Sequence, residues 1–227
     1  MEKLIIAIDG PAGAGKSTIS KMIAEKVGIP YINTGAMYRA VGVMAQENKI
    51  DLKDEKSLEK FINNIKIDFI WDGKKDKILF NNIDITEKIF TPEAGKAASD
   101  VSTVPIVRKN MVKLQQDLGK RNGGVLEGRD IGTVVFPDAD VKIFLSASAK
   151  ERATRRYNEM KSKGQTVDYN QILEGIKYRD QQDSSRKTAP LKKAEDAIEI
   201  DTTGIGINEV LDKIYNIVVK KSKKGKI

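Results

Sequence analysis

A buried strand, a glycine-rich loop and a helix open the chain, and this unit constrains its fold more than any other feature. Residues Leu4 to Ile8 form an uninterrupted apolar run, which is typical of a parallel strand covered on both faces. From about Lys16 to Val27, apolar residues recur at the spacing of a helix. The loop between them, Gly10 to Ser17, fits the pattern G-x-x-x-x-G-K-S/T, which in this context predicts a cradle for phosphate groups.

Each part of this loop has a chemical role in the prediction. The glycines let backbone N–H groups converge on phosphate oxygens, and the helix start adds a partial positive charge. We expect Lys16 to reach the β- and γ-phosphates of a nucleotide and Ser17 to bind magnesium. The alternative is a glycine-rich turn with an exposed lysine, which chance produces in roughly a few per cent of such chains or fewer. The expected ATP-binding residues are Gly10, Pro11, Ala12, Gly13, Ala14, Gly15, Lys16, Ser17 and Thr18.

Strands and helices alternate along much of the remaining chain. Short apolar runs at 30–32, 125–126, 141–145 and 198–200 are interpreted as strands, and amphipathic segments lie between them. This alternation predicts an α/β fold with a parallel sheet flanked by helices, as in P-loop nucleotide-binding proteins.

Local signals predict several helix boundaries. Pro105 favours the start of a helix. Ser148 and Glu151 match a capping box, which predicts a helix that continues to about Lys161. A Lys-Gly-Gln sequence then interrupts the pattern, and a further helix is expected from about Tyr169 to Gln181.

The pattern between the expected strands at 30–32 and 125–126 is different. Three short strands are expected at 65–71, 78–80 and 83–85, with Asp72-Gly73 and Asn81-Asn82 as turn residues. Hairpin-connected strands that interrupt an α/β chain predict a small inserted β-subdomain.

Composition limits the chemistry and the partners. The 227 residues include no cysteine and no histidine, which removes disulfides, thiolate zinc sites and the usual general base. A net charge of +8 indicates an anionic partner, without choosing among nucleic acid, membrane and phosphorylated metabolite. No apolar run reaches the roughly 18 residues that span a membrane, and no secretory signal is recognisable, so we expect a cytoplasmic protein. The length suits one domain with an insertion, or two small domains.

Arginines recur beside strand ends and helix starts, where planar guanidinium groups suit the oxygens of a transferring phosphoryl group. They are Arg39, Arg129, Arg152, Arg155, Arg156, Arg179 and Arg186. For any single one, a solvated surface position is the alternative. The strand at 141–145 ends in Ser-Ala-Ser, without the magnesium-binding acid that is usual in ATPase and GTPase motors. The pattern therefore favours a small-molecule kinase.

Four segments, in this order, resemble bacterial cytidylate kinases. They are Gly10 to Thr18, Asn33 to Arg39, Glu127 to Pro137, and Arg179 to Leu191, and the resemblance that they carry covers essentially the whole chain. The third segment, Glu-Gly-Arg-Asp-Ile-Gly-Thr-Val-Val-Phe-Pro, is the most restricted. Two positions differ from the commoner pattern, because Asn33 and Glu127 each stand where Asp is more usual.

The resemblance implies a single nucleoside monophosphate kinase domain that transfers the γ-phosphoryl group of ATP to CMP or dCMP, with Mg²⁺, as a monomer. Its core would comprise residues 1–33, 120–148 and 190–227. The monophosphate-binding region with the β-insert would be 34–119, and a helical lid 149–189. The loop Asp201-Thr202-Thr203 would lie near adenine.

The resemblance also implies roles for particular residues. For the substrate they are Thr34, Arg39 and Arg129 at the CMP phosphate, Ser99, Arg108 and Asp130 at cytosine, Arg179 and Asp183 at the ribose, and Gly128 beside them. The catalytic residues that it implies are Lys16, Arg129, Arg155, Arg156 and Arg186.

Other functions are compatible with parts of this pattern. The nearest alternative is a P-loop kinase for another monophosphate or a sugar. A basic nucleic-acid-binding ATPase is compatible with the charge, but aromatic residues are only 6% and do not interleave with a basic stripe. We therefore expect small-molecule nucleotides as partners, and neither nucleic acid nor membrane.

Overall fold

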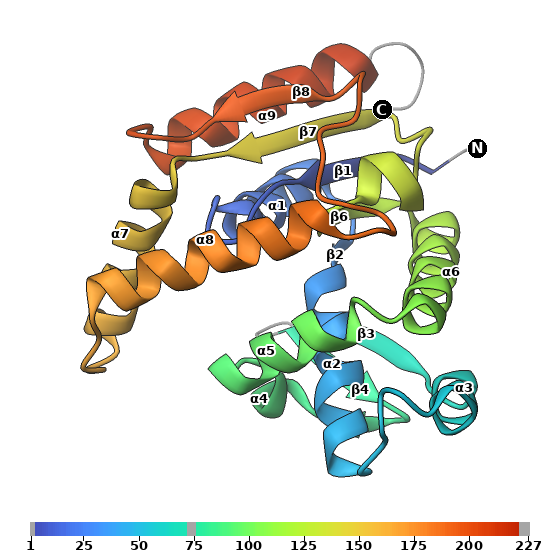
Figure 1. Cartoon of the computed structure of the whole chain (residues 1–227). Coiled ribbons are helices and arrows are strands. Elements are labelled where there is room, and N and C mark those ends of the chain that lie inside the picture. The colour runs from blue at the N-terminus through green and yellow to red at the C-terminus, as the bar shows by residue number, and fades with distance from the viewer. Residues whose placement is uncertain (1–2, 72–75, 223–227) are drawn as a thin grey trace. The chain divides into compact units, whose positions relative to one another are not determined.

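The computed structural model describes residues 3–71 and 76–222, and the chain divides into two compact units (Figure 1). One unit comprises Met1–Tyr31 with Leu118–Ile227, and the other comprises Ile32–Asp117. The bounds of the second unit are close to those of the region at 34–119 that we expect to bind the monophosphate. That binding role stays a prediction. Within the described residues, no helix combines the length and the apolar composition that crossing a membrane requires.

A five-stranded sheet forms the centre of the first unit and confirms the predicted parallel arrangement. Its order is β2 (Tyr31–Asn33), β6 (Gly124–Gly128), β1 (Ile5–Asp9), β7 (Val141–Ser146) and β8 (Ile198–Asp201). Strand β1 pairs in parallel with both β6 and β7, so that Asp9 lies opposite Gly128 and Phe144. Because parallel strands end at the same edge of a sheet, the residues that follow β1 and β6 lie close together.

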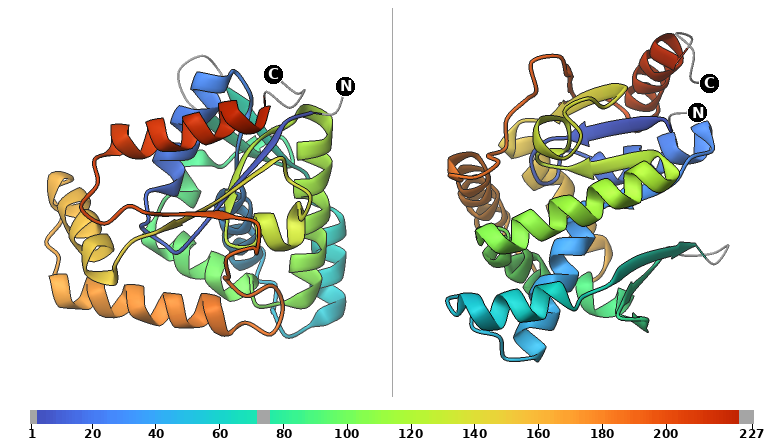
Figure 2. Two further views of the ribbon diagram at one scale, coloured as in Figure 1. Left: turned by 90° about the horizontal axis from the view of Figure 1, so that it is seen from above. Right: turned by 90° about the vertical axis from the view of Figure 1, so that its right-hand side faces the viewer.

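Helices α1 (Lys16–Val27) and α9 (Ile207–Ser222) pack on the sheet and form the apolar core with it (Figure 2). Ile23 of α1 and Ile214 of α9 are fully buried, as are Ile6 and Ile8 of β1. Burial of each such side chain contributes about 1.5–3 kcal/mol. The core therefore holds β1 and α1 rigidly at the two ends of the phosphate loop.

Helices α7 (Ala149–Ser162) and α8 (Tyr169–Ser185) lie side by side in the first unit (Figures 1 and 2). The Ser148 hydroxyl accepts a hydrogen bond from the Glu151 N–H at 3.1 Å, as the capping pattern predicts. Helix α8 continues to Ser185, so the expected end at Gln181 was wrong. Its last turn persists because the Asp183 carbonyl accepts hydrogen bonds from the Leu191 N–H and from Arg186 Nε.

The second unit contains the inserted sheet. Strands β3 (Ile67–Trp71), β4 (Asp76–Phe80) and β5 (Ile83–Asp84) are antiparallel and occur in that order. Asn81 and Asn82 have φ angles of 49° and 68° and form the predicted turn. The predicted turn at Asp72-Gly73 lies outside the described residues.

Strand β5 is shorter than expected, because the Asp84 carboxylate accepts the Thr86 N–H and the chain turns into a helix. Besides α2 (Thr34–Glu47), the unit contains α3 (Glu55–Asn63), α4 (Thr86–Ile89) and α5 (Pro92–Val101). The predicted α6 (Pro105–Asn122) begins in this unit. Helices α3, α4 and α5 were not predicted. Two of them carried a local signal, since the side chains of Asp54 and Thr91 cap their first N–H groups.

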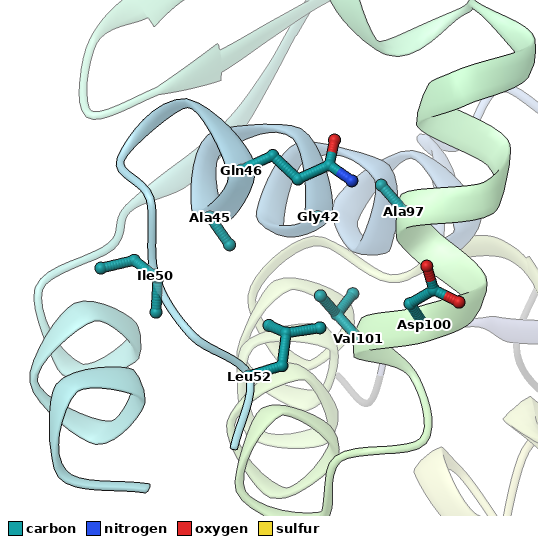
Figure 3. Close-up of a pocket in the computed structure, with 8 residues that line it drawn as sticks. All are labelled: Gly42, Ala45, Gln46, Ile50, Leu52, Ala97, Asp100 and Val101. Carbon is teal, nitrogen blue, oxygen red and sulfur yellow. The ribbon is translucent and has the colours of Figure 1, made fainter. Parts of the chain in front are cut away.

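A small cavity lies between α2 and α5 and is lined by Gly42, Ala45, Gln46, Ile50, Leu52, Ala97, Asp100 and Val101 (Figure 3). A side chain at Gly42 would come within 2.6 Å of the Ala97 backbone, so glycine permits the close approach of the two helices. The cavity volume is about 40 Å³, enough for about one water molecule. It is a packing gap and is far too small for a nucleotide.

Candidate active site

The phosphate loop leaves β1 through a conformation that only glycine tolerates. Gly10 has a φ of 147°, and a Cβ atom there would lie 2.0 Å from the Leu145 carbonyl oxygen. Gly15, with a φ of 88°, lies immediately before α1 in the left-handed region. The loop is therefore pressed against the end of β7 and enters α1 with its N–H groups available to an anion.

Lys16 begins α1 and is buried beside the loop. Its Nζ donates a hydrogen bond to the Pro11 carbonyl at 2.7 Å. Burial and the nearby Arg129 guanidinium hold the pKa of Lys16 well below its ordinary value of 10.5, although Glu127 and Asp9 act in the opposite direction. Because positive groups are forced together here, a bound polyanion would relieve their repulsion.

Ser17 and Glu127 meet although they are far apart in the sequence. The Ser17 hydroxyl donates to Glu127 Oε1 at 2.8 Å, and the Tyr31 hydroxyl donates to the same oxygen at 2.6 Å. Glu127 is buried and lies near the end of β6, the strand beside β1. No acid follows the strand at 141–145, which is β7, whereas Glu127 lies on β6, the other neighbour of β1.

The side chains of Ser17 and Glu127 are suitable ligands for a metal ion. Among the described residues, no cluster of three or more acidic side chains could hold an ion alone. A serine hydroxyl and a carboxylate are oxygen donors of the type that Mg²⁺ prefers, and Mg²⁺ is usually shared with substrate phosphates. Ser17 and Glu127 therefore fit an ion that a nucleotide brings with it.

Asp9 is a buried carboxylate that sequence reasoning did not select. It accepts hydrogen bonds from the N–H groups of Ile131 and Gly132 at 2.9 and 2.8 Å. These residues begin the π-helical turn η1 (Ile131–Val135), directly after Asp130. Burial raises the pKa of Asp9 to about 6, partly offset by those two hydrogen bonds. Its only sequence signal was an acid placed between an apolar strand and the glycine loop.

Arg129 and Arg186 converge on one carboxylate. Arg129 Nε donates to Asp183 Oδ2 at 2.9 Å, and an Arg186 terminal nitrogen lies 3.4 Å from Asp183 Oδ1. Burial opposes the charge of Asp183, but Arg129, Arg186 and the nearby Arg179 hold its pKa below the ordinary value of 3.8. Arg129 and Arg179 also lower the pKa of Lys16, so these two arginines lie near the lysine of the phosphate loop as well as near Asp183.

The three arginines at the start of α7 make different contacts. Arg155 donates to the Thr202 carbonyl and hydroxyl at 2.6 and 3.0 Å and pairs with Glu151. Arg156 is exposed and pairs with Glu159 on its own helix. Arg152 is buried and binds other parts of the unit. Each of the three guanidinium groups therefore has its own partners.

Four of the predicted substrate-binding residues lie in the second unit. Thr34 is buried at the start of α2, where the Asn33 side chain accepts the Ala36 N–H at 2.9 Å. Asn caps a helix as well as Asp does, which explains why this helix start tolerates Asn33. Arg39 donates to the Ile89 carbonyl at 3.3 Å.

Arg108 and Ser99 are brought near one another through Ser102. The guanidinium of buried Arg108 lies 5.7 Å from the centre of the Tyr38 ring and donates to the Ser102 carbonyl at 3.5 Å. The Ser102 hydroxyl donates to the Ser99 carbonyl at 2.8 Å.

A strand, a glycine-rich loop and a helix on a parallel sheet, with a lysine and several arginines gathered at the loop, define a phosphotransferase of the P-loop class. The sequence profile of the cytidylate kinase family matches residues 6–220. The chain belongs to the cytidylate kinase family and is a kinase.

Curated relatives agree with this assignment. The chain is 50% identical over 220 residues to a cytidylate kinase of Caldicellulosiruptor bescii, covering 97% of each chain. It is 50% identical over 222 residues to a cytidylate kinase of Bacillus subtilis, covering 98% of this chain and 99% of the relative. Among solved structures, an uncharacterized protein from Eubacterium ventriosum has a TM-score of 0.55 at 17% identity, over 96% of this chain and 99% of that one. That likeness concerns the fold alone.

Proposed function

We propose that this kinase transfers the γ-phosphoryl group of ATP to CMP or dCMP and releases ADP with CDP or dCDP. The observation that carries the proposal is a linked set of cations beside the phosphate loop. Arg129 lies near Lys16 of the loop and shares the Asp183 carboxylate with Arg186. Relatives at 50% identity that are named cytidylate kinase support CMP as the acceptor.

In this proposal, the phosphate loop and Lys16 bind the phosphates of ATP. The loop N–H groups donate to phosphate oxygens, and Lys16 exchanges its bond to the Pro11 carbonyl for the β- and γ-phosphates. Ser17 and Glu127 are the residues that would hold Mg²⁺. When bound, the ion neutralises phosphate charge and orients the γ-phosphoryl group.

The acceptor needs no general base. A phosphate monoester is already largely dianionic at neutral pH, so an oxygen of the CMP phosphate attacks the γ-phosphorus directly. The bond from that phosphorus to the bridging oxygen breaks, and ADP leaves with the electron pair. Arg129 and Arg186 neutralise the charge on the transferring group, and Asp183 orients both guanidinium groups.

Arg155 and Arg156 would complete this set of cations. We assign them to the transferring group once α7 and α8 close over it and exclude water. Arg179, together with Asp183, would also approach the ribose. Thr34 and Arg39 would hold the CMP phosphate, with Gly128 beside Arg129.

Ser99, Arg108 and Asp130 are assigned to the cytosine ring. Cytosine carries an amino donor at position 4 and an acceptor at N3, where uracil has the reverse pattern. A carboxylate such as Asp130 can accept from the amine, and Arg108 can donate to N3. The carbonyl of uracil would face the Asp130 carboxylate, one acceptor against another, which gives discrimination by hydrogen bonding.

A coupled assay of ADP release with CMP, dCMP, UMP, AMP and GMP tests the proposal. We expect the highest kcat/KM with CMP or dCMP. The Asp130→Ala variant should lower kcat/KM for CMP, so that the preference for CMP over UMP becomes smaller. If both values fall together at a fixed ratio, Asp130 orients Arg129 and does not recognise the base. If the protein phosphorylates no monophosphate and instead binds mixed-sequence RNA in a salt-sensitive way, a nucleic-acid-binding ATPase would be favoured.

A further inference from the structure

Arg152 is held more tightly than its neighbours at the start of α7. Its side chain is only 5% exposed. Its Nε donates to the Ala147 carbonyl at 2.9 Å, just before the helix. Its two terminal nitrogens bind both oxygens of Asp180 on α8, at 3.0 and 2.6 Å. This two-point geometry is the strongest form of an arginine–carboxylate pair.

The same guanidinium also reaches the phosphate loop. A terminal nitrogen of Arg152 donates to the Ala12 carbonyl at 3.1 Å. A Cβ atom at Gly13 would lie 3.2 Å from the Arg152 Cβ, so the loop and the side chain approach closely here. One side chain therefore joins three segments, namely the phosphate loop, the start of α7 and the middle of α8.

The hydrogen bond from Arg152 to the Ala12 carbonyl determines the direction of the Gly13 N–H in the loop. In a planar trans peptide the carbonyl and the following N–H point in opposite directions. Holding the Ala12 carbonyl towards Arg152 therefore turns the Gly13 N–H away from Arg152. Backbone N–H groups of such loops are the groups that bind nucleotide phosphates.

We propose that Arg152 is a positioning residue that holds the Ala12–Gly13 peptide in the orientation that binds ATP, and that Asp180 in turn orients Arg152. The inference rests on the proposed function, because it assigns the loop to ATP. In this role Arg152 contacts no substrate. It differs from Arg155 and Arg156, which we assign to the transferring phosphoryl group.

The test compares Arg152→Lys, Asp180→Asn and the double variant. Lysine keeps the charge but loses the fork that spans Ala12 and Asp180, and asparagine keeps the volume but loses the charge. We expect each single variant to raise the KM for ATP roughly tenfold and the KM for CMP less than about twofold. The double variant should resemble the worse single variant, because both changes break one linkage.

A matched control is Glu174→Gln, which breaks an exposed pair with Lys177 on α8 and should change neither KM. Equal increases in both KM values, or a lowered melting temperature with both KM values unchanged, would show that the pair only supports the fold. Loss of folding in both single variants would lead to the same conclusion.

Titration with a fluorescent ATP analogue, without acceptor, separates this inference from the proposed function. If the wild-type protein phosphorylates no monophosphate, the proposed function fails. The roughly tenfold weakening of analogue binding in the two single variants is still expected in that case. Unchanged analogue binding would overturn the role of Arg152 whatever the acceptor.

Discussion

The hydroxyl of Ser17 donates a hydrogen bond to Glu127 across 2.8 Å, although 110 residues separate the two. The parallel pairing of β1 with β6 makes this contact, because both strands end at the same edge of the sheet. The residue expected to bind magnesium is thus oriented by a buried carboxylate, in a chain that has neither histidine nor cysteine.

Glu127→Gln should therefore raise the Mg²⁺ concentration that activity requires more than it raises the KM for ATP. We expect the Mg²⁺ concentration for half-maximal activity to rise roughly tenfold or more. Glutamine removes the charge from one of the two oxygen donors that would hold the ion, and even partners outside the ligand shell have effects of this size. Titration of activity with MgCl₂ measures it. Tyr31→Phe removes the other hydrogen bond to the same oxygen and should have a smaller effect. Equal effects of the two variants would contradict a special link between Ser17 and Glu127.

Lys16→Met should separate catalysis from stability. We expect kcat to fall on the order of 10²-fold or more, because a preorganised charge on the transferring group is lost. The melting temperature at pH 7 should be unchanged or higher, because burial and Arg129 make this charge unfavourable in the folded protein. Steady-state kinetics and thermal melting of one preparation check both. Normal turnover with normal melting would refute the assignment of the phosphate loop.

Asp9→Asn should change how stability depends on pH. The folded protein binds the Asp9 proton more tightly than the unfolded chain does, since the pKa is about 6 rather than 3.8. The stability that this pKa difference contributes is fully present below pH 3.8 and is lost as the pH rises through about 6. At roughly 1.4 kcal/mol per pKa unit, the loss is about 3 kcal/mol.

Asparagine does not titrate, so the variant avoids this loss. Its free energy of unfolding, relative to the wild type, should rise by about 2 kcal/mol or more between pH 4 and pH 8. Urea denaturation at both pH values measures this. Asp54→Asn is a control in which the stability relative to the wild type should change with pH in the opposite direction. Hydrogen bonds from Ser57 lower the pKa of that exposed carboxyl. A constant difference for Asp9→Asn across this range would show that Asp9 does not titrate there.

Arg155→Ala should affect catalysis more than Arg156→Ala. Arg155 lies against Thr202, and its terminal nitrogen is 3.9 Å from the position of a Cβ atom at Gly15, whereas Arg156 pairs with Glu159 in solvent. We expect Arg155→Ala to lower kcat roughly tenfold or more, and to raise the KM for ATP less, because lid arginines act on closure. Equal losses in kcat and in ATP affinity would indicate a static contact with ATP.

Much of the fold could be predicted because its signals are local. The apolar run of β1, the glycine pattern of the loop and the helical spacing of α1 are contiguous, and the structure confirms all three. The capping pattern at Ser148 and the asparagine turn at Asn81 also depend on neighbouring residues only. Helices α3 and α5 were missed because each is short, at 9 and 10 residues, and is stabilised mainly by packing within its unit.

The sequence by itself determined the strand–loop–helix unit, the parallel sheet and the resemblance to cytidylate kinases, since short motifs contain all of that information. Only the tertiary structure decided which side chains meet. In it, Ser17 donates to Glu127, Asp9 accepts from the Ile131 N–H, and Arg152 pairs with Asp180. The physical reason is that these contacts depend on strand order and helix packing. Residues more than 25 positions apart become neighbours there, and no local pattern encodes their distance.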